Sequence, residues 1–349
     1  MKILITGSCG FIGFSFANFL LQDKKNQIIG IDNLNNYYSV KLKKDRLRIL
    51  KEKKNFFFYN FDIKNLSSID KIFKKKKIDV VFNFAAQAGV RYSLKNPRSY
   101  IENNISGFYN IVELSIKYKI KKLFYASSSS VYGDDKRYPL SEKNQIKPKN
   151  IYGLSKKINE EIVDVLPKNN ITKFVGLRFF TVYGEWGRPD MFMIKYLNAT
   201  FNKSKVFYLN NYGNHVRDFT YIKDACKILK ELLYIKLKHK HLILNICSNK
   251  PIKLTNIIKK IDDLTLNKPR IKKRSLQKAD ILKTHGDNSL VKKITGIKEY
   301  TDISEGIEQT VKWFIKNKNK IIFWFKLIVI IFQRKVYHIL QHCFLKYIF

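Results

Sequence analysis

The sequence predicts an α/β fold built on a doubly wound parallel sheet, with a smaller substrate-binding lobe towards the C-terminus. Three observations predict it. Strand-like and helix-like patterns alternate through the first half of the chain, and a glycine loop follows the first strand. In addition, nearly every motif whose residues could bind a ligand or take part in catalysis comes directly after a predicted strand. Folds of this class bind their ligands at that edge of the sheet.

The first element is an apolar run over residues 2–6, which has the pattern of a buried strand. The loop Gly7-Ser8-Cys9-Gly10-Phe11-Ile12-Gly13 follows and leads into an apolar helical pattern. Glycines let the backbone approach a pyrophosphate, and the helix N-terminus behind them favours its negative charge. A glycine-rich turn without a ligand is the alternative interpretation.

The second strand, residues 27–31, ends in Asp32, about twenty residues beyond the last loop glycine, as a dinucleotide-binding unit requires. A carboxylate at this place accepts hydrogen bonds from ribose hydroxyls and repels a 2′-phosphate. We therefore expect a Rossmann-type site that prefers NAD to NADP.

Further strands are predicted over residues 56–61, 79–84, 122–126 and 173–178, with helices over 99–118, 151–165 and 303–316. The strands end at Asp62, at Ala85-Ala86, at the serine cluster 127–130 and before Thr181. We expect residues 1–180 to form the nucleotide-binding domain, to which the chain returns at about 214–246. Residues 181–316 form mainly the substrate lobe, and residues 317–349 are a basic, apolar tail.

Tyr152 and Lys156 lie four residues apart on the predicted helix 151–165 and so share one face. A nearby ammonium favours the phenolate and lowers the pKa of tyrosine from about 10, which makes Tyr152 a candidate base. In a lysine-rich chain this spacing also arises by chance on a surface helix. The glycine loop and the serine cluster, in the right order, favour the catalytic interpretation.

The charge is extreme, with 67 Lys and Arg against 28 Asp and Glu and a net charge of +39. The lysines are spread along the whole chain and do not gather on one element, so no nucleic-acid partner is predicted. The four cysteines are scattered without the spacing of metal ligands. We expect no metal site, and a reducing, cytoplasmic location.

Several segments resemble the extended short-chain dehydrogenase/reductase superfamily and, within it, the UDP-glucuronate 4-epimerases. They cover residues 31–38, 85–93, 127–133, 177–184, 186–191 and 217–222, and the similarity runs from Met1 to about Lys316. Two positions depart from the family pattern, because residues 277–280 replace a usual Pro-Gly pair and Glu185 replaces a proline.

The resemblance implies that NAD oxidises the sugar at C4 and returns the hydride to its other face. Tyr152 then acts as the base, Lys156 holds the nicotinamide ribose, and Ser128 hydrogen-bonds the 4-oxygen. The residues implied to bind the cofactor are Gly7, Gly10, Phe11, Ile12, Gly13, Asp32, Asn33, Asp62, Ile63, Ala85, Ala86 and Lys156.

The resemblance also implies the substrate contacts. Related dehydratases carry an Asp and a Glu in place of Ser129 and Ser130, and related decarboxylases carry a Glu in place of Ser130. Hydroxyls there can donate to a sugar carboxylate without repelling it. Thr181 and Arg188 resemble further carboxylate contacts, and arginine suits bidentate binding. For Arg188 a surface salt bridge is the alternative.

The remaining implied substrate residues are Arg217, which contacts the diphosphate, and Asp280, which contacts the uridine ribose. Tyr152 and Ser128 also touch the sugar. The family further implies a homodimer built on helices 99–118 and 151–165, and a role in supplying surface-polysaccharide precursors. The other functions that fit are an epimerase of an uncharged UDP-hexose, a UDP-glucuronate decarboxylase, and a catalytically silent NAD- or nucleotide-sugar-binding protein.

The tail contains an apolar run at 321–332 interrupted by Lys326. This run is shorter than the roughly 20 residues that span a bilayer. A basic and aromatic segment can instead lie peripherally at the inner face of the membrane through residues 318–349. The alternative is an extension that packs on a partner subunit or stays unstructured.

Overall fold

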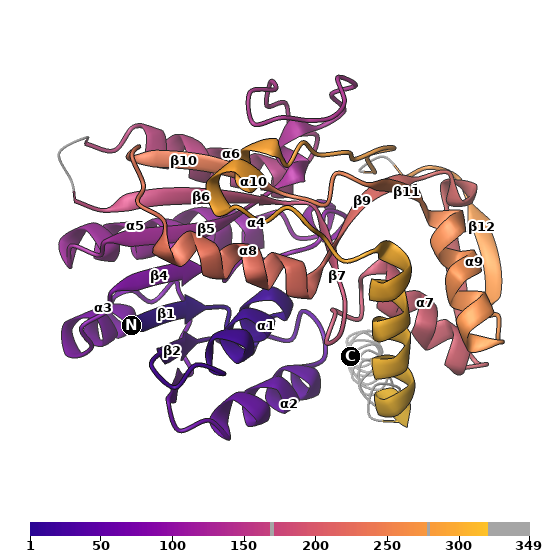
Figure 1. Cartoon of the computed structure of the whole chain (residues 1–349), viewed down its shortest axis with the longest axis horizontal. Helices are drawn as coiled ribbons and strands as arrows, with labels where there is room; N and C mark the ends of the chain where they lie inside the picture. Colours follow the sequence, from indigo (N-terminus) through magenta and orange to yellow (C-terminus); the bar gives the residue numbers. More distant parts are fainter. Residues whose placement is uncertain (168–170, 278–279, 320–349) are drawn as a thin grey trace, which may run out of the picture.

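The computed structural model describes residues 1–167, 171–277 and 280–319. Its largest sheet has seven strands, all parallel, in the order β10-β6-β5-β4-β1-β2-β3 (Figure 1). The strands are β1 (Lys2–Thr6), β2 (Gln27–Ile31), β3 (Phe56–Tyr59), β4 (Val80–Asn83), β5 (Lys122–Ser128), β6 (Lys173–Phe179) and β10 (His241–Ile246). The strand order reverses between β1 and β4, which is where doubly wound folds open a ligand crevice. The predicted fold class is confirmed.

Helices cover both faces of this sheet. One face carries α1 (Phe11–Leu20), α2 (Val40–Lys51) and α8 (Ile222–Tyr234), and the other carries α3 (Leu66–Lys75), α5 (Gly107–Lys117) and α6 (Ile151–Asp164). Phe14 and Ile228 belong to the first core, and Ile111 and Val163 belong to the second. Burial on both faces explains why the strands read as unbroken apolar runs and not as alternating patterns.

The second lobe holds two small sheets. The first comprises β7 (Thr181–Tyr183), β9 (Val216–Tyr221) and β11 (Pro251–Lys253), and the second comprises β8 (Val206–Asn210) and β12 (Arg270–Arg274). The helices α7 (Phe192–Phe201) and α9 (Leu254–Thr265) flank them (Figure 1). Because β9 lies in the small sheet, the return to the main sheet begins with α8 and not at 214 as predicted. Helix α10 (Ser289–Thr295) then packs on α8 and β10.

The closing helix occupies residues 303–319 and begins where the sequence predicted. Its Ile307, Val311 and Phe314 are buried in the same apolar core as Phe14 of α1. The ring of Trp313 lies 5.4 Å from that of Trp186. This helix therefore joins the two lobes instead of finishing only the second one.

The predicted helix 99–118 is interrupted in the structure. It consists of α4 (Arg98–Tyr100), a π-helical turn η2 (Ile101–Ser106) and α5. The turn contains Asn104, whose buried amide accepts from the Gln87 N–H at 2.7 Å and donates to the Ser155 hydroxyl at 3.0 Å. A π-turn inside an α-helix often marks a functional site. Here it fixes the loop after β4 against helix α6.

A buried ion pair connects α6 to β6. The Arg178 guanidinium donates to both oxygens of Glu160, at 3.0 and 2.7 Å, and their side chains are 2% and 4% exposed. The same carboxylate accepts a hydrogen bond from Ser127 at the end of β5. Removing one partner of such a pair leaves an uncompensated charge in the interior.

We predict that Glu160→Gln lowers the free energy of unfolding by about 3 kcal/mol, because Arg178 is left buried without its counter-ion. The next residue supplies the control. Glu161 pairs with Lys157 at 3.3 Å on the exposed side of the same helix, and Glu161→Gln should change stability by less than about 0.5 kcal/mol. Urea denaturation of both variants measures the difference. Equal losses would contradict a structural role for the buried pair.

Candidate active site

A cavity of about 780 Å³ lies at the carboxyl ends of the parallel strands and is lined by residues of both lobes. The predicted site residues that line it are Gly7, Gly10, Phe11, Ile12, Gly13, Asp32, Asn33, Ile63, Ala85, Ala86, Ser128, Ser129, Ser130, Tyr152, Lys156, Thr181, Arg188, Arg217 and Asp280. Asp62 is not among the lining residues. Its carboxylate accepts from the Asn33 amide at 3.0 Å and so supports the wall from behind.

The glycine loop turns tightly between β1 and α1. Gly7 has φ of +68°, and a Cβ there would lie 2.8 Å from the Ala85 nitrogen, while a Cβ on Gly13 would collide with the Gly7 carbonyl. Side chains are thus excluded where β1, α1 and the loop after β4 meet. The Asp32 carboxylate accepts from the Cys9 N–H at 2.9 Å, which ties the end of β2 to the loop.

These features fit a dinucleotide. The loop presents backbone N–H groups at the N-terminus of α1, where a pyrophosphate is favoured. Asp32 stands at the wall where a ribose is expected. Farther along the same cavity, Lys156 is 3% exposed. Its ammonium makes no hydrogen bond or ion pair with any residue that the structure describes. A buried cation without a protein partner is costly, so its retention in a cavity wall indicates that a ligand supplies the partner.

Tyr152 and Lys156 both lie on α6 and line the cavity, as predicted. The expected lowering of the phenol pKa by Lys156 is wrong for the ligand-free protein. Burial raises the pKa of Tyr152, and a hydrogen bond with Ser128 and the charge of Arg188 only partly oppose it. Burial also lowers the pKa of Lys156 to about 8, against the attraction of Glu160.

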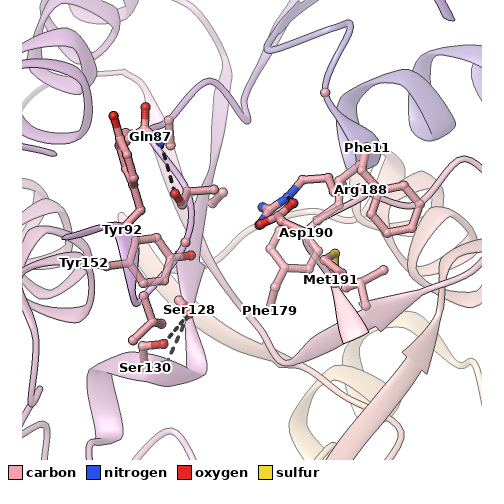
Figure 2. A pocket seen from close by; sticks show the side chains of 18 of the residues that line it. Phe11, Gln87, Tyr92, Ser128, Ser130, Tyr152, Phe179, Arg188, Asp190 and Met191 are labelled. Atoms are coloured by element: carbon pink, nitrogen blue, oxygen red, sulfur yellow. Dashed lines mark hydrogen bonds and ion pairs between the residues drawn. The ribbon is translucent and has the colours of Figure 1, made fainter. Parts of the chain in front are cut away.

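The serine cluster begins where β5 ends. Ser128 caps the short helix η3 (Ser129–Tyr132), and its hydroxyl accepts from the Ser130 N–H at 3.2 Å. The two hydroxyls also lie 3.2 Å apart. Ser127 points the other way, into the contact with Glu160. The cluster therefore presents hydroxyls to the cavity beside the Tyr152 ring (Figure 2).

Arg188 faces Tyr152 and Ser128 from the opposite wall (Figure 2). Its guanidinium donates to both oxygens of Asp190, at 3.0 and 2.7 Å. The structure is compatible with both interpretations of Arg188, as a carboxylate contact and as a salt bridge, because Arg188 forms a salt bridge that faces the cavity. Sequence reasoning missed Asp190 as a site residue, although it stands two residues after the arginine in a segment of family resemblance.

Arg217 and Asp280 also line the cavity and are engaged by protein groups. Arg217 donates to the carbonyls of Ile281 and Leu282, and burial lowers its pKa to about 10. Both carboxylate oxygens of Asp280 accept from one edge of the Arg91 guanidinium, Oδ1 from Nε at 3.0 Å and Oδ2 from Nη2 at 2.8 Å. Arg91 follows β4, so this pair bridges the two lobes. The sequence analysis did not predict that Arg91 pairs with Asp280, nor that Asn104 fixes the loop after β4.

Among residues 1–167, 171–277 and 280–319, no group of three or more His, Cys, Asp or Glu is arranged to hold a metal ion. The groups that line the cavity include the phenol of Tyr152, the ammonium of Lys156, the serine hydroxyls and the guanidinium of Arg188. These groups suit proton transfer at a hydroxyl and binding of a carboxylate.

Comparison with known proteins gives consistent results. The model of the NAD dependent epimerase/dehydratase family matches residues 3–247. The UDP-glucuronate 4-epimerase of Thermodesulfobacterium geofontis is 36% identical over 320 residues, which cover 90% of this chain and 96% of that protein. Protein CapI of Staphylococcus aureus is 37% identical over 341 residues, covering 92% and 100%.

Among solved structures, the UDP-glucuronic acid 4-epimerase of Bacillus cereus, in complex with UDP-glucuronic acid and NAD, superposes with a TM-score of 0.85 at 29% identity. The match covers 90% of this chain and 99% of that one. The similarity thus includes both lobes and the whole cavity.

We predict that Lys156→Met stabilises the ligand-free protein at pH 7 by about 3 kcal/mol, since the pKa of Lys156 falls from 10.5 unfolded to about 8 folded. Below pH 8 the wild type bears the whole cost of burying the ammonium. Between pH 8 and 10.5 the folded state releases the proton first, so wild-type stability rises and the difference shrinks.

Urea denaturation at pH 7 and pH 9.5 measures this effect. Lys157→Met is the matched control, because that side chain is 32% exposed and faces away towards Glu161. Its difference from wild type should not change between the two pH values. The same pH dependence in both variants would contradict an uncompensated ammonium at Lys156.

Proposed function

This chain belongs to the NAD-dependent epimerase/dehydratase family, and we propose that it interconverts UDP-glucuronate and UDP-galacturonate at C4. The observation that carries the proposal is the arrangement in Figure 2, where Tyr152 and Ser128 face Arg188 across one cavity. A hexuronate lying between these walls brings its 4-hydroxyl to the phenol and its carboxylate to the guanidinium. The hydroxyls of Ser129, Ser130 and Thr181 complete the carboxylate contacts.

In the mechanism, Tyr152 accepts the proton of the 4-hydroxyl while Ser128 holds the 4-oxygen. Bound NAD would supply the acceptor and donor of the C4 hydride, so that there would be no net redox change. Lys156 anchors the ribose next to the nicotinamide, while the hydrogen bond with Ser128 and the charge of Arg188 favour the phenolate that burial disfavours. Tyr152 finally returns its proton to the 4-oxygen of the inverted sugar.

Inversion requires the 4-keto sugar to turn over while the rest of the substrate stays bound. Arg217 and Asp280 line the same cavity and are the groups to hold the diphosphate and uridine ribose. Their present contacts, with backbone carbonyls and with Arg91, keep these charged groups satisfied until the nucleotide takes their place.

An epimerase of an uncharged UDP-hexose is the second candidate, and one observation favours it. Because Asp190 pairs with Arg188, the guanidinium that faces Tyr152 is not free to bind a carboxylate in the ligand-free structure. A UDP-glucuronate decarboxylase is disfavoured because Ser130 is not an acid. A silent binding protein is disfavoured because Tyr152, Lys156 and Ser128 all line the cavity.

We also propose a homodimer. The π-turn η2 and helix α5 pack beside α6, and large apolar side chains on this surface are exposed, with Ile101 at 53%, Tyr109 at 46% and Leu154 at 41%. Burying them against a second copy would remove this apolar area from water. Light scattering on the purified protein tests the assembly.

We place the enzyme in the cytoplasm, where it supplies surface-polysaccharide precursors. Loss of galacturonate from the surface of cells that lack the enzyme tests that role.

The tail beyond residue 319 lies outside the described residues. No helix among the described residues is both long and apolar enough to cross a bilayer. From its sequence we propose that 318–349 contacts anionic membranes peripherally, each basic residue contributing about 1 kcal/mol. Sedimentation with anionic liposomes, with and without 318–349, tests this.

We predict that the purified protein converts UDP-glucuronate to UDP-galacturonate and that Tyr152→Phe lowers this rate by at least about 100-fold, because the base is lost. Binding of UDP-glucuronate should change little. NMR of the product mixture measures turnover, and Tyr234→Phe at the exposed end of α8 is the control. A UDP-pentose product would instead assign a decarboxylase, and full activity of Tyr152→Phe would remove that residue from the mechanism.

We further predict that Arg188→Ala weakens UDP-glucuronate binding by about 10- to 100-fold, since a charge-assisted bidentate contact is worth about 1.5–3 kcal/mol. UDP-glucose binding should change much less, because that sugar has no carboxylate. Calorimetry with both ligands gives the comparison. A similar loss for the two ligands would make Arg188 a structural residue and favour the uncharged-hexose epimerase.

A further inference from the structure

We propose that Asp190 is a specificity-determining residue that acts as an internal carboxylate, occupying Arg188 in the empty site and yielding it to the carboxylate of the substrate. This proposal rests on the proposed function. It adds that the carboxylate of Asp190 competes with the carboxylate of the substrate for Arg188. The affinity for a uronate is then set by an exchange of two carboxylates on one guanidinium, and not by Arg188 alone.

The geometry of the pair carries the proposal. Asp190 uses both oxygens to accept from the Nε and Nη2 groups of Arg188, which is the bidentate contact that a free carboxylate would make. Both side chains line the cavity and are partly open to it, at 21% for Arg188 and 36% for Asp190. A uronate that binds on the same side of the guanidinium must displace Asp190.

Asp190 has other partners when Arg188 is taken. The Tyr37 hydroxyl donates to its Oδ2 at 3.3 Å, and Asp190 lies just before Met191, the N-cap of α7. The positive end of a helix dipole stabilises a nearby anion. Asp190 can therefore remain charged after the exchange, and its open side can be hydrated.

The backbone around Arg188 is held, so the exchange is a movement of side chains. The Gly187 N–H donates to the Gly184 carbonyl at 3.2 Å, and the Met191 N–H donates to the Arg188 carbonyl at 3.1 Å. The buried Arg46 donates to the carbonyls of Cys9 and Trp186, which ties this loop to the glycine loop. Only the two side chains of the pair have to move.

The exchange explains how one cavity can discriminate by charge. With UDP-glucuronate, the substrate replaces Asp190 and gains a bidentate contact. With UDP-glucose, the Arg188–Asp190 pair stays closed, so no buried cation is left unpaired. The contact energy of the uronate is reduced by the energy of the pair that it breaks.

The test is Asp190→Asn, measured by calorimetry with UDP-glucuronate and UDP-glucose on NAD-loaded protein that also carries Tyr152→Phe, so that the sugar is not turned over. Removing the competing charge should lower the dissociation constant for UDP-glucuronate about tenfold and leave that for UDP-glucose within about twofold. Asp190→Ser, which removes the charge with a smaller side chain, should give the same change.

The matched control is Asp135→Asn. Asp135 and Arg137 form a bidentate pair with the same two-residue spacing, at 3.0 and 2.7 Å, but neither residue lines the cavity. This variant should change neither affinity. Combining Asp190→Asn with Arg188→Ala should abolish the gain, because no guanidinium is left to be released.

Weaker UDP-glucuronate binding in Asp190→Asn and Asp190→Ser would overturn the proposal and make Asp190 a residue that orients Arg188. Unchanged binding would overturn it as well. Unchanged UDP-glucose affinity verifies that each variant is folded. The proposed function fails separately, if the protein with Tyr152 and Asp190 intact does not epimerise UDP-glucuronate.

Discussion

One buried carboxylate holds together the three elements that build the active site. Glu160 lies on α6, one turn after Lys156, and accepts from Ser127 at the end of β5 and from Arg178 on β6. These elements carry the serine cluster, Tyr152 with Lys156, which we propose as the base and its neighbour, and the strand that leads to Thr181. A charge this deep is stable only with its partners, so each element is fixed relative to the others. The positions of the reacting groups depend on this constraint.

Three charged side chains of the cavity are already paired with groups of the protein. Arg188, Arg217 and Asp280 are each satisfied by protein groups in the ligand-free structure, by Asp190, by backbone carbonyls and by Arg91. Lys156 is the contrast, because burial lowers its pKa and no described residue pairs with it. The site thus keeps paired charges where we propose that the substrate binds, and a cation without a described partner where the cofactor is expected. Burial of the Lys156 ammonium therefore lowers the stability of the ligand-free protein, and we expect the ammonium to function only in the complex with the cofactor.

The sequence predicted what depends on local pattern. Alternating apolar runs indicated the parallel sheet, and the glycine loop with Asp32 indicated the nucleotide side of the cavity. Resemblance to a family added Arg188 and the serine cluster. The features that the sequence could not predict depend on contacts across the fold. The π-turn is associated with the contact between Asn104 and the loop after β4. The pKa of Tyr152 is raised because the effect of burial outweighs the opposing effects of Ser128 and Arg188. The pairing of Arg188 with Asp190 needed coordinates because the same residues, in another loop conformation, would point apart.

We propose that one carbon of a UDP-uronate is oxidised and re-reduced in this cavity without release of the hydride to solvent. The most direct measurement uses UDP-glucuronate labelled with deuterium at C4, incubated with the protein in ordinary water and followed by NMR. We expect UDP-galacturonate that retains the deuterium at C4. Loss of the label to solvent during conversion would contradict it.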